Sequence, residues 1–239
     1  MSMFASLGKK PVDTNYPFPA WPAHIILVVE DALRLASKSA ESLLGGKAKL
    51  LVATEEQITA SIQNTLHEIL SDGTIVEGFT TDIFQSISRN ESVEDYTGAY
   101  LDKQPDLTFK LVGQCKPHQG LYCECKILDR THPVRNYLYD GLSRFVTGKY
   151  AWAMQHAHMI GYVRDKNLSP LNLTTYLAQN NKSEGKTHSD CLQIQGVPVI
   201  RPNDLVFTNH DRRFKLIRLS TTPDAIPIPI AIRHLWLNI

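Results

Sequence analysis

Two short segments, residues 105–112 and 121–128, constrain the fold more than any other part of the sequence. In each of them apolar and polar residues alternate, which is the pattern of a β-strand with one buried face. The turn-rich stretch 116–120 lies between them, so the sequence predicts a β-hairpin. A chain that contains this hairpin needs further elements to cover its apolar positions.

Helices with one apolar face are predicted on both sides of the hairpin. Their expected ranges are 22–44, 55–71, with Thr54 as the N-cap, and 136–153. Residues 160–163 form a short apolar segment that predicts another strand. The order helix, hairpin, helix, strand indicates an α/β fold.

The two ends of the chain give weaker signals. Residues 1–21 contain several prolines and are expected to form an extended arm, and 180–189 is expected to be a polar linker. A short helix over 171–177 should follow Ser169-Pro170. Strands are predicted at 205–208, 214–220 and 228–237, and the prolines beside the last one favour an edge position at its beginning.

Composition fits an ordinary globular domain and excludes several classes of protein. The 239 residues are 43% hydrophobic and 21% charged, which is enough to bury one core. The apolar run Ile25–Val29 is far shorter than the roughly 20 residues that cross a bilayer. With no secretory signal pattern either, no membrane association and a cytoplasmic location are expected. The net charge of +1 means that nucleic-acid binding would need a local basic patch.

Zinc sites are not indicated. The four cysteines include no CxxC pair and are interpreted as small buried residues. His156 and His158 share a strand face, but the sequence offers no third ligand near them.

Three charged residues of the predicted hairpin are expected to converge. Side chains two positions apart on a strand share a face, so Glu124 and Lys126 project together. Asp106 stands at the start of the partner strand, which pairing across the turn would bring beside them. Carboxylates that hold Mg²⁺ and a group that orients water are what phosphodiester hydrolysis needs.

The arrangement Pro105-Asp106, then Glu124-Cys125-Lys126 with Glu124 18 positions after Asp106, resembles the signature of the PD-(D/E)xK superfamily, the restriction-endonuclease-like nucleases. The resemblance implies a mixed central β-sheet flanked by helices, with extra strands at the C-terminal end. It divides the chain into an N-terminal arm and helix (1–53), a nuclease core (54–163) and an extension that completes the same domain (164–239).

The resemblance also implies roles for particular residues. Asp106, Glu124 and the backbone carbonyl of Cys125 would hold Mg²⁺, or Mn²⁺ in its place, and Lys126 would position the attacking water. Glu55 would join the metal shell, since it precedes the apolar helix face, whereas Glu56 is rotated by about 100° from it. Equally, these acids simply favour a helix N-terminus. Glu68 is a weaker third choice.

Two basic residues follow the motif, and the resemblance implies contacts to the phosphate backbone for both. Arg144 and Lys149 lie on the predicted helix 136–153, where solvated helix charges are the other interpretation.

The expected function is that of a metal-dependent DNA endonuclease, with RNA also open as the substrate. It would serve as an effector of a bacterial antiphage defence or restriction system, either as a homo-oligomer or with a partner protein. One alternative is a noncatalytic nucleic-acid-binding or assembly subunit that retains the fold. Another is a purely structural hairpin, for which Asp106 and Glu124 should lie more than about 8 Å apart, too far to share a metal ion.

Overall fold

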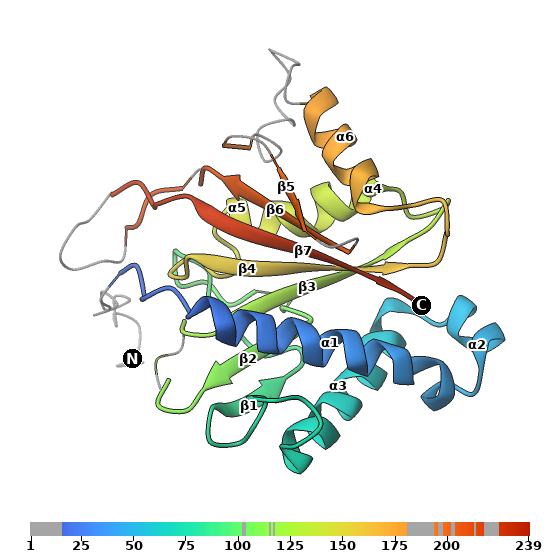
Figure 1. Ribbon diagram of the computed structural model, residues 1–239. Helices are drawn as coiled ribbons and strands as arrows, with labels where there is room; N and C mark the ends of the chain where they lie inside the picture. The colour runs from blue at the N-terminus through green and yellow to red at the C-terminus, as the bar shows by residue number, and fades with distance from the viewer. Residues whose placement is uncertain are drawn as a thin grey trace, which may run out of the picture.

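The computed structural model describes residues 16–101, 104–114, 116, 118–180, 194–195, 198–201, 204–212, 214–217 and 225–239. Its centre is a seven-stranded sheet in the order β1-β2-β3-β4-β7-β6-β5 (Figure 1). The strands are β1 (Phe84–Ser88), β2 (Leu107–Leu111), β3 (Leu121–Leu128), β4 (His156–Val163), β5 (Val199–Arg201), β6 (Leu205–His210) and β7 (Ile230–Asn238). β3, β4 and β7 are parallel and the other neighbours antiparallel, so the predicted α/β class with a mixed sheet is confirmed.

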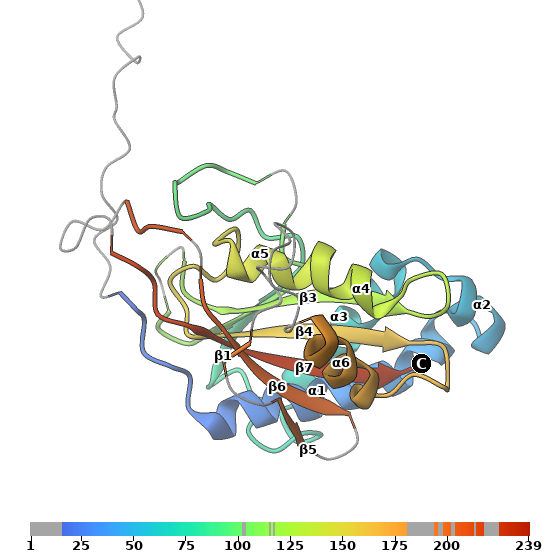
Figure 2. The same cartoon turned by 90° about the horizontal axis from the view of Figure 1, so that it is seen from above.

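Helices cover both faces of this sheet (Figures 1 and 2). On one face lie α1 (Ala23–Leu43) and α3 (Glu55–Asp72), joined by the short α2 (Lys47–Val52). On the other lie α6 (Pro170–Asn180) and three consecutive helical segments, α4 (Val134–Asn136), η1 (Tyr137–Leu142) and α5 (Ser143–Val146). Within the described ranges, no helix is both long and apolar enough to cross a membrane.

The start of α3 is fixed by a capping box, as the sequence around Thr54 predicts. The Thr54 hydroxyl accepts a hydrogen bond from the Gln57 amide at 3.2 Å, and the Gln57 side chain accepts one from the Thr54 amide at 2.8 Å. The apolar residues on one face of this helix, among them Ile58 and Ile62, are buried in the core. Glu55 is therefore held as the first residue of a rigid helix.

The predicted hairpin is confirmed with its predicted strands. Leu107 of β2 pairs with Cys123 of β3 in an antiparallel ladder, and Cys123 and Cys125 are completely buried. Asp106 comes immediately before this first pair. It is thus placed beside the half of β3 that carries Glu124 and Lys126.

The helix predicted over 136–153 begins earlier and ends sooner than expected. Helical backbone runs from residue 134 to 146, and Gly148 then adopts a left-handed conformation with φ of +78°. Arg212, buried and far along the chain, donates hydrogen bonds to the carbonyls of Ala151, Trp152 and Met154. These carbonyls lie in the irregular segment after the helix, and the sequence around them does not reveal their partner.

One strand prediction in the C-terminal third is wrong and another is confirmed. Residues 214–217 form no strand and make one isolated bridge, Leu216 to Ala225, while 218–220 lie outside the described residues. The strand predicted over 228–237 is confirmed as β7, but it is not an edge strand: β6 pairs with it from Ile230 and β4 from Ala231, and both prolines precede this ladder.

Other elements differ from the prediction or cannot be compared with it. The strands near residues 205 and 160 are confirmed and longer than expected, as is α6. No prediction was made for α2, β1 or β5. Most of the linker 180–189 and residues 1–15 of the arm lie outside the described residues.

A buried ion pair joins α1 to the sheet and makes stability depend on acid pH. Burial alone would raise the pKa of Glu30, but hydrogen bonds from His158 and Arg233 outweigh it and lower that pKa to about 2 from 4.5. Because the folded pKa is depressed, the contribution is complete above pH 4.5 and is lost as the pH falls towards 2. We expect a loss of about 3 kcal/mol over this interval.

Urea unfolding of the wild type and Glu30→Gln across about pH 2 to 7 tests this expectation. The difference in free energy of unfolding should be largest at neutral pH and should shrink in acid, since only the wild type carries this titrating group. Parallel curves for the two proteins would contradict it.

Candidate active site

The residues of the predicted site line one cleft, at the end of β3 that follows Glu124. The cleft has a volume of about 570 Å³. It is bounded by the start of α3, the beginning of β2, the end of β3, the loop after β3 and the helical segments η1 and α5. Its lining residues are Glu55, Asn90, Gln104, Asp106, Lys126, Ile127, His132, Asn136, Tyr137, Asp140 and Arg144.

The ammonium group of Lys126 is the point at which the site converges. Its Nζ lies 2.7 Å from Glu124 Oε1, 2.8 Å from Glu55 Oε1 and 2.7 Å from the carbonyl oxygen of Cys125. Asp106 Oδ2 is 3.9 Å away. The ammonium thus has an acceptor for each of its three protons, and a third carboxylate nearby.

Two of the carboxylates bind backbone amides of β3. Asp106 Oδ2 accepts a hydrogen bond from the Cys125 amide at 2.7 Å, and Glu55 Oε2 accepts one from the Ile127 amide at 3.2 Å. The ladder between β2 and β3 begins at Cys123, so β2 does not satisfy these two amides. The two carboxylates accept these hydrogen bonds in place of a partner strand. These bonds fix both carboxylates relative to Lys126.

Glu124 is completely buried between β3 and the helix above it. Its Oε1 accepts from Lys126 and, at 2.6 Å, from Arg144, whereas its buried Oε2 has no hydrogen-bond partner among the described residues. Burial, reinforced by the charge of Asp106, raises the pKa of Glu124 to about 7 against the lowering effect of the two cations. Burial likewise raises the pKa of Asp106. Burial therefore favours the protonated form of both carboxyl groups over the charged form.

Arg144 lies inside the cleft, but Lys149 does not. The Arg144 guanidinium bonds Glu124 and the Tyr150 hydroxyl, the latter at 3.0 Å, and its side chain is 14% exposed. Lys149 is exposed beyond the end of α5 and is absent from the cleft lining. Of the two predicted phosphate contacts, the structure brings only Arg144 to the carboxylates.

The π-helical segment η1 passes very close to β3. A Cβ at Gly141 would come within 2.5 Å of Met159 Cε and 3.4 Å of Glu124 Cγ, so glycine permits the approach. Such segments are frequent at functional sites. The approach places the helix directly over Glu124.

Several lining residues were not predicted from the sequence. Tyr137 and Asp140 precede the predicted Arg144 at helical spacing, and this spacing was a signal that the sequence contains. Asn90 and Gln104 come from an irregular loop, and His132 comes from the turn after β3; none of these three has a local pattern that marks it.

The donor set suits Mg²⁺ better than zinc. No three side chains of His, Cys, Asp or Glu in the described part of the protein are placed to hold a metal ion. Mg²⁺ needs fewer, since it usually binds one or two carboxylates and completes its shell with water and substrate phosphate. The unpartnered, buried Oε2 of Glu124 is an oxygen that such an ion would satisfy.

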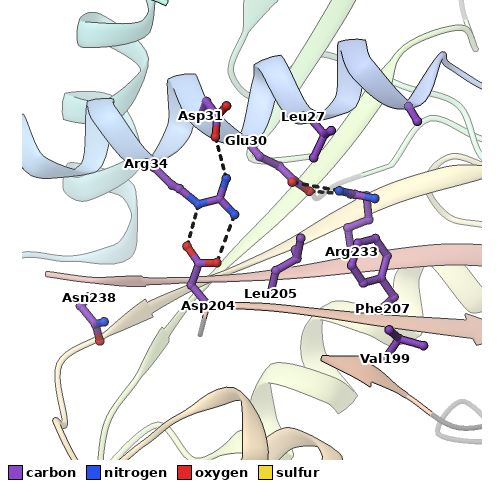
Figure 3. A pocket seen from close by; sticks show the side chains of 11 residues that line it. Leu27, Glu30, Asp31, Arg34, Val199, Asp204, Leu205, Phe207, Arg233 and Asn238 are labelled. Atoms are coloured by element: carbon purple, nitrogen blue, oxygen red, sulfur yellow. Dashed lines mark hydrogen bonds and ion pairs between the residues drawn. The ribbon is translucent and has the colours of Figure 1, made fainter. Parts of the chain in front are cut away.

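A larger cleft, of about 1030 Å³, lies between α1 and strands β5 to β7 (Figure 3). Its charged side chains pair with one another: Glu30 with Arg233, and Arg34 with both Asp204 and Asp31. Leucine, valine and phenylalanine side chains line the rest. The arginines of this cleft are thus paired with carboxylates of its own wall.

Comparisons with known proteins add no relative. The sequence matches no family model and no curated protein, and no match is found among the solved structures. Functional assignment must therefore be argued from the residues of the cleft.

Proposed function

We propose that this protein is a metal-dependent nuclease of the PD-(D/E)xK, restriction-endonuclease-like kind that hydrolyses phosphodiester bonds in DNA. One observation carries the proposal. Glu55, Asp106 and Glu124 are far apart in the sequence, yet all three carboxylates gather around Lys126 at the wall of an open cleft. Buried or half-buried charges are costly, and a catalytic site is where such a cluster has a use.

The fold around the cluster supports the same assignment. Asp106 immediately precedes β2, and the Glu-x-Lys motif lies on its antiparallel neighbour β3, within a mixed sheet that helices cover on both faces. This agrees with what the resemblance implies for the core. A bacterial defence or restriction system remains a proposal based on the resemblance.

In this proposal, Asp106, Glu124 and the Cys125 carbonyl would hold Mg²⁺ or Mn²⁺. The bound ion would neutralise charge on the phosphate and lower the pKa of water. Lys126 orients the attacking water and stabilises negative charge developing on the phosphate. Glu55 fixes Lys126 through its 2.8 Å contact, and Arg144 fixes Glu124.

The alternative of a purely structural hairpin loses support from the geometry. Glu124 Oε1 and Asp106 Oδ2 both lie within 3.9 Å of the same nitrogen. They are therefore closer together than the separation of about 8 Å that would prevent a shared ion. A noncatalytic subunit that keeps the fold is the other alternative, and it predicts the absence of cleavage.

Replacing Asp106 by asparagine should abolish cleavage. The wild type should cut plasmid and linear duplex DNA only with Mg²⁺ or Mn²⁺, and Asp106→Asn should be slower by about 10²-fold or more because it loses a charged ligand. The measurement is cleavage of DNA, with RNA of the same sequence in parallel and Mg²⁺ binding by calorimetry.

Asp82→Asn, which changes an exposed aspartate away from the cleft, is the matched control and should cut like the wild type. Absence of both cutting and Mg²⁺ binding in the wild type would favour the noncatalytic subunit. Metal binding without cutting would indicate a missing activator, and cutting of RNA alone would change the substrate.

A further inference from the structure

His132 stands in the turn that connects the motif strand β3 to the helix above the site. The turn closes on itself through a hydrogen bond from the Asp129 amide to the His132 carbonyl, at 3.2 Å. His132 lines the same cleft as Lys126 and Asp106, and its side chain is 53% exposed. It is therefore accessible to a substrate bound there.

The Asp129 side chain in this turn determines which ring nitrogen of His132 carries a hydrogen. Asp129 Oδ1 lies 2.9 Å from His132 Nδ1 and also accepts from the His132 amide at 2.8 Å. Partial burial raises the pKa of Asp129, but hydrogen bonds from Thr131 and His132 lower it to about 2. Its carboxylate can only accept, so Nδ1 carries a hydrogen.

The contacts of the ring leave the second nitrogen available. Among the described residues, the ring bonds only Asp129 and Thr131, and both bonds use Nδ1. A carboxylate on Nδ1 orients the ring, as in other acid–base histidines. Nε2 thus has no partner among the described residues, and it can give a proton to a ligand in the cleft when the ring is protonated.

The roles proposed above for the cleft residues provide no proton donor for the leaving oxygen. Lys126 is bound to three acceptors, and Arg144 is bound to Glu124 and Tyr150. Among these lining residues, His132 has a ring nitrogen without a partner in the described part of the protein.

We propose that His132 is the general acid that protonates the leaving oxygen during phosphodiester cleavage, with Asp129 as its positioning residue. Water forms the new P–O bond, and the bond from phosphorus to the bridging sugar oxygen breaks. The proton of Nε2 passes to that oxygen, which leaves as a hydroxyl group. The neutral imidazole then regains a proton from solvent, matching the one that the attacking water releases. This inference rests on the proposed nuclease function.

The test compares two leaving groups in the same full-length protein. A DNA duplex is prepared with either oxygen or sulfur as the bridging leaving atom at one mapped cleavage bond, because a thiolate leaves without being protonated. His132→Gln should slow cleavage of the oxygen substrate by about 10²-fold. It should slow the sulfur substrate by less than about 10-fold, since that substrate needs no general acid.

Two further variants separate proton donation from structure. Asp129→Asn keeps an acceptor oxygen for the turn but loses the charge that orients the ring, so it should show the same preference with a smaller loss. His67→Gln replaces an exposed histidine on α3 outside the cleft and should leave both rates unchanged.

Equal losses of His132→Gln on both substrates, or no loss on the oxygen substrate, overturn the general-acid role while the nuclease assignment stands. A wild type that cuts neither substrate overturns the nuclease assignment, and this inference falls with it.

Discussion

Replacing Lys126 by methionine should abolish cleavage while tightening the binding of Mg²⁺. Methionine is close to lysine in length but has no charge. The ammonium now occupies Glu124 Oε1 and the Cys125 carbonyl, two of the oxygens proposed to bind the ion. Removing the ammonium group frees these oxygens and removes a positive charge that repels Mg²⁺, so the affinity for Mg²⁺ should rise several-fold. Cleavage should fall by about 10²–10³-fold, as it does when one preorganised donor is lost.

Calorimetric titration with Mg²⁺ and single-turnover cleavage measure the two effects in the same preparation. Lys110→Met is the matched control, because Lys110 is also a half-buried lysine paired with a carboxylate, that of Glu91, outside the cleft. Arg144 still pairs with Glu124 in Lys126→Met, so folding should survive. A variant that loses metal affinity together with cleavage would show that Lys126 supports the ligands rather than competing for them.

Local sequence patterns were sufficient where short-range physics determines the structure. Thr54 and Gln57 cap α3, and the alternating residues on both sides of Leu107 and Cys123 pair as predicted. Because a strand has a period of two, the pairing alone placed Asp106 next to Glu124. The core of the candidate site was predictable for this reason.

Longer-range interactions determine what the sequence did not reveal. The chain leaves the helix at residue 146, and a distant, buried Arg212 binds the carbonyls of Ala151, Trp152 and Met154 in the segment that follows. Edge strand β1 forms by pairing with β2 across an irregular loop, and its short length gave no periodic signal. His132 reaches the cleft through a turn in which the Asp129 side chain contacts both the amide and the ring of His132. Each of these three features depends on a contact with a residue that the local sequence pattern does not indicate.

Replacing Arg233 by methionine should cost the most stability of the changes considered. Arg233 donates to both oxygens of Glu30, at 2.5 and 2.9 Å, in one wall of the larger cleft (Figure 3). Glu30 has no exposed surface, so the variant leaves a buried carboxylate with His158 as its main partner. Breaking a buried pair in this way typically costs about 3–5 kcal/mol.

The same cleft offers a matched control, since Arg34 also makes a two-bond contact with a carboxylate, that of Asp204, but is 26% exposed. Arg34→Met should cost about 1 kcal/mol, because water can replace the lost partner. The double variant Glu30→Leu with Arg233→Met should be more stable than Arg233→Met alone, since no unpaired charge is then buried. Urea unfolding of the wild type, the single variants Arg233→Met, Glu30→Leu and Arg34→Met, and the double variant decides the matter. Equal costs for the two arginines, or simple additivity in the double variant, would mean that the desolvated carboxylate does not dominate the effect.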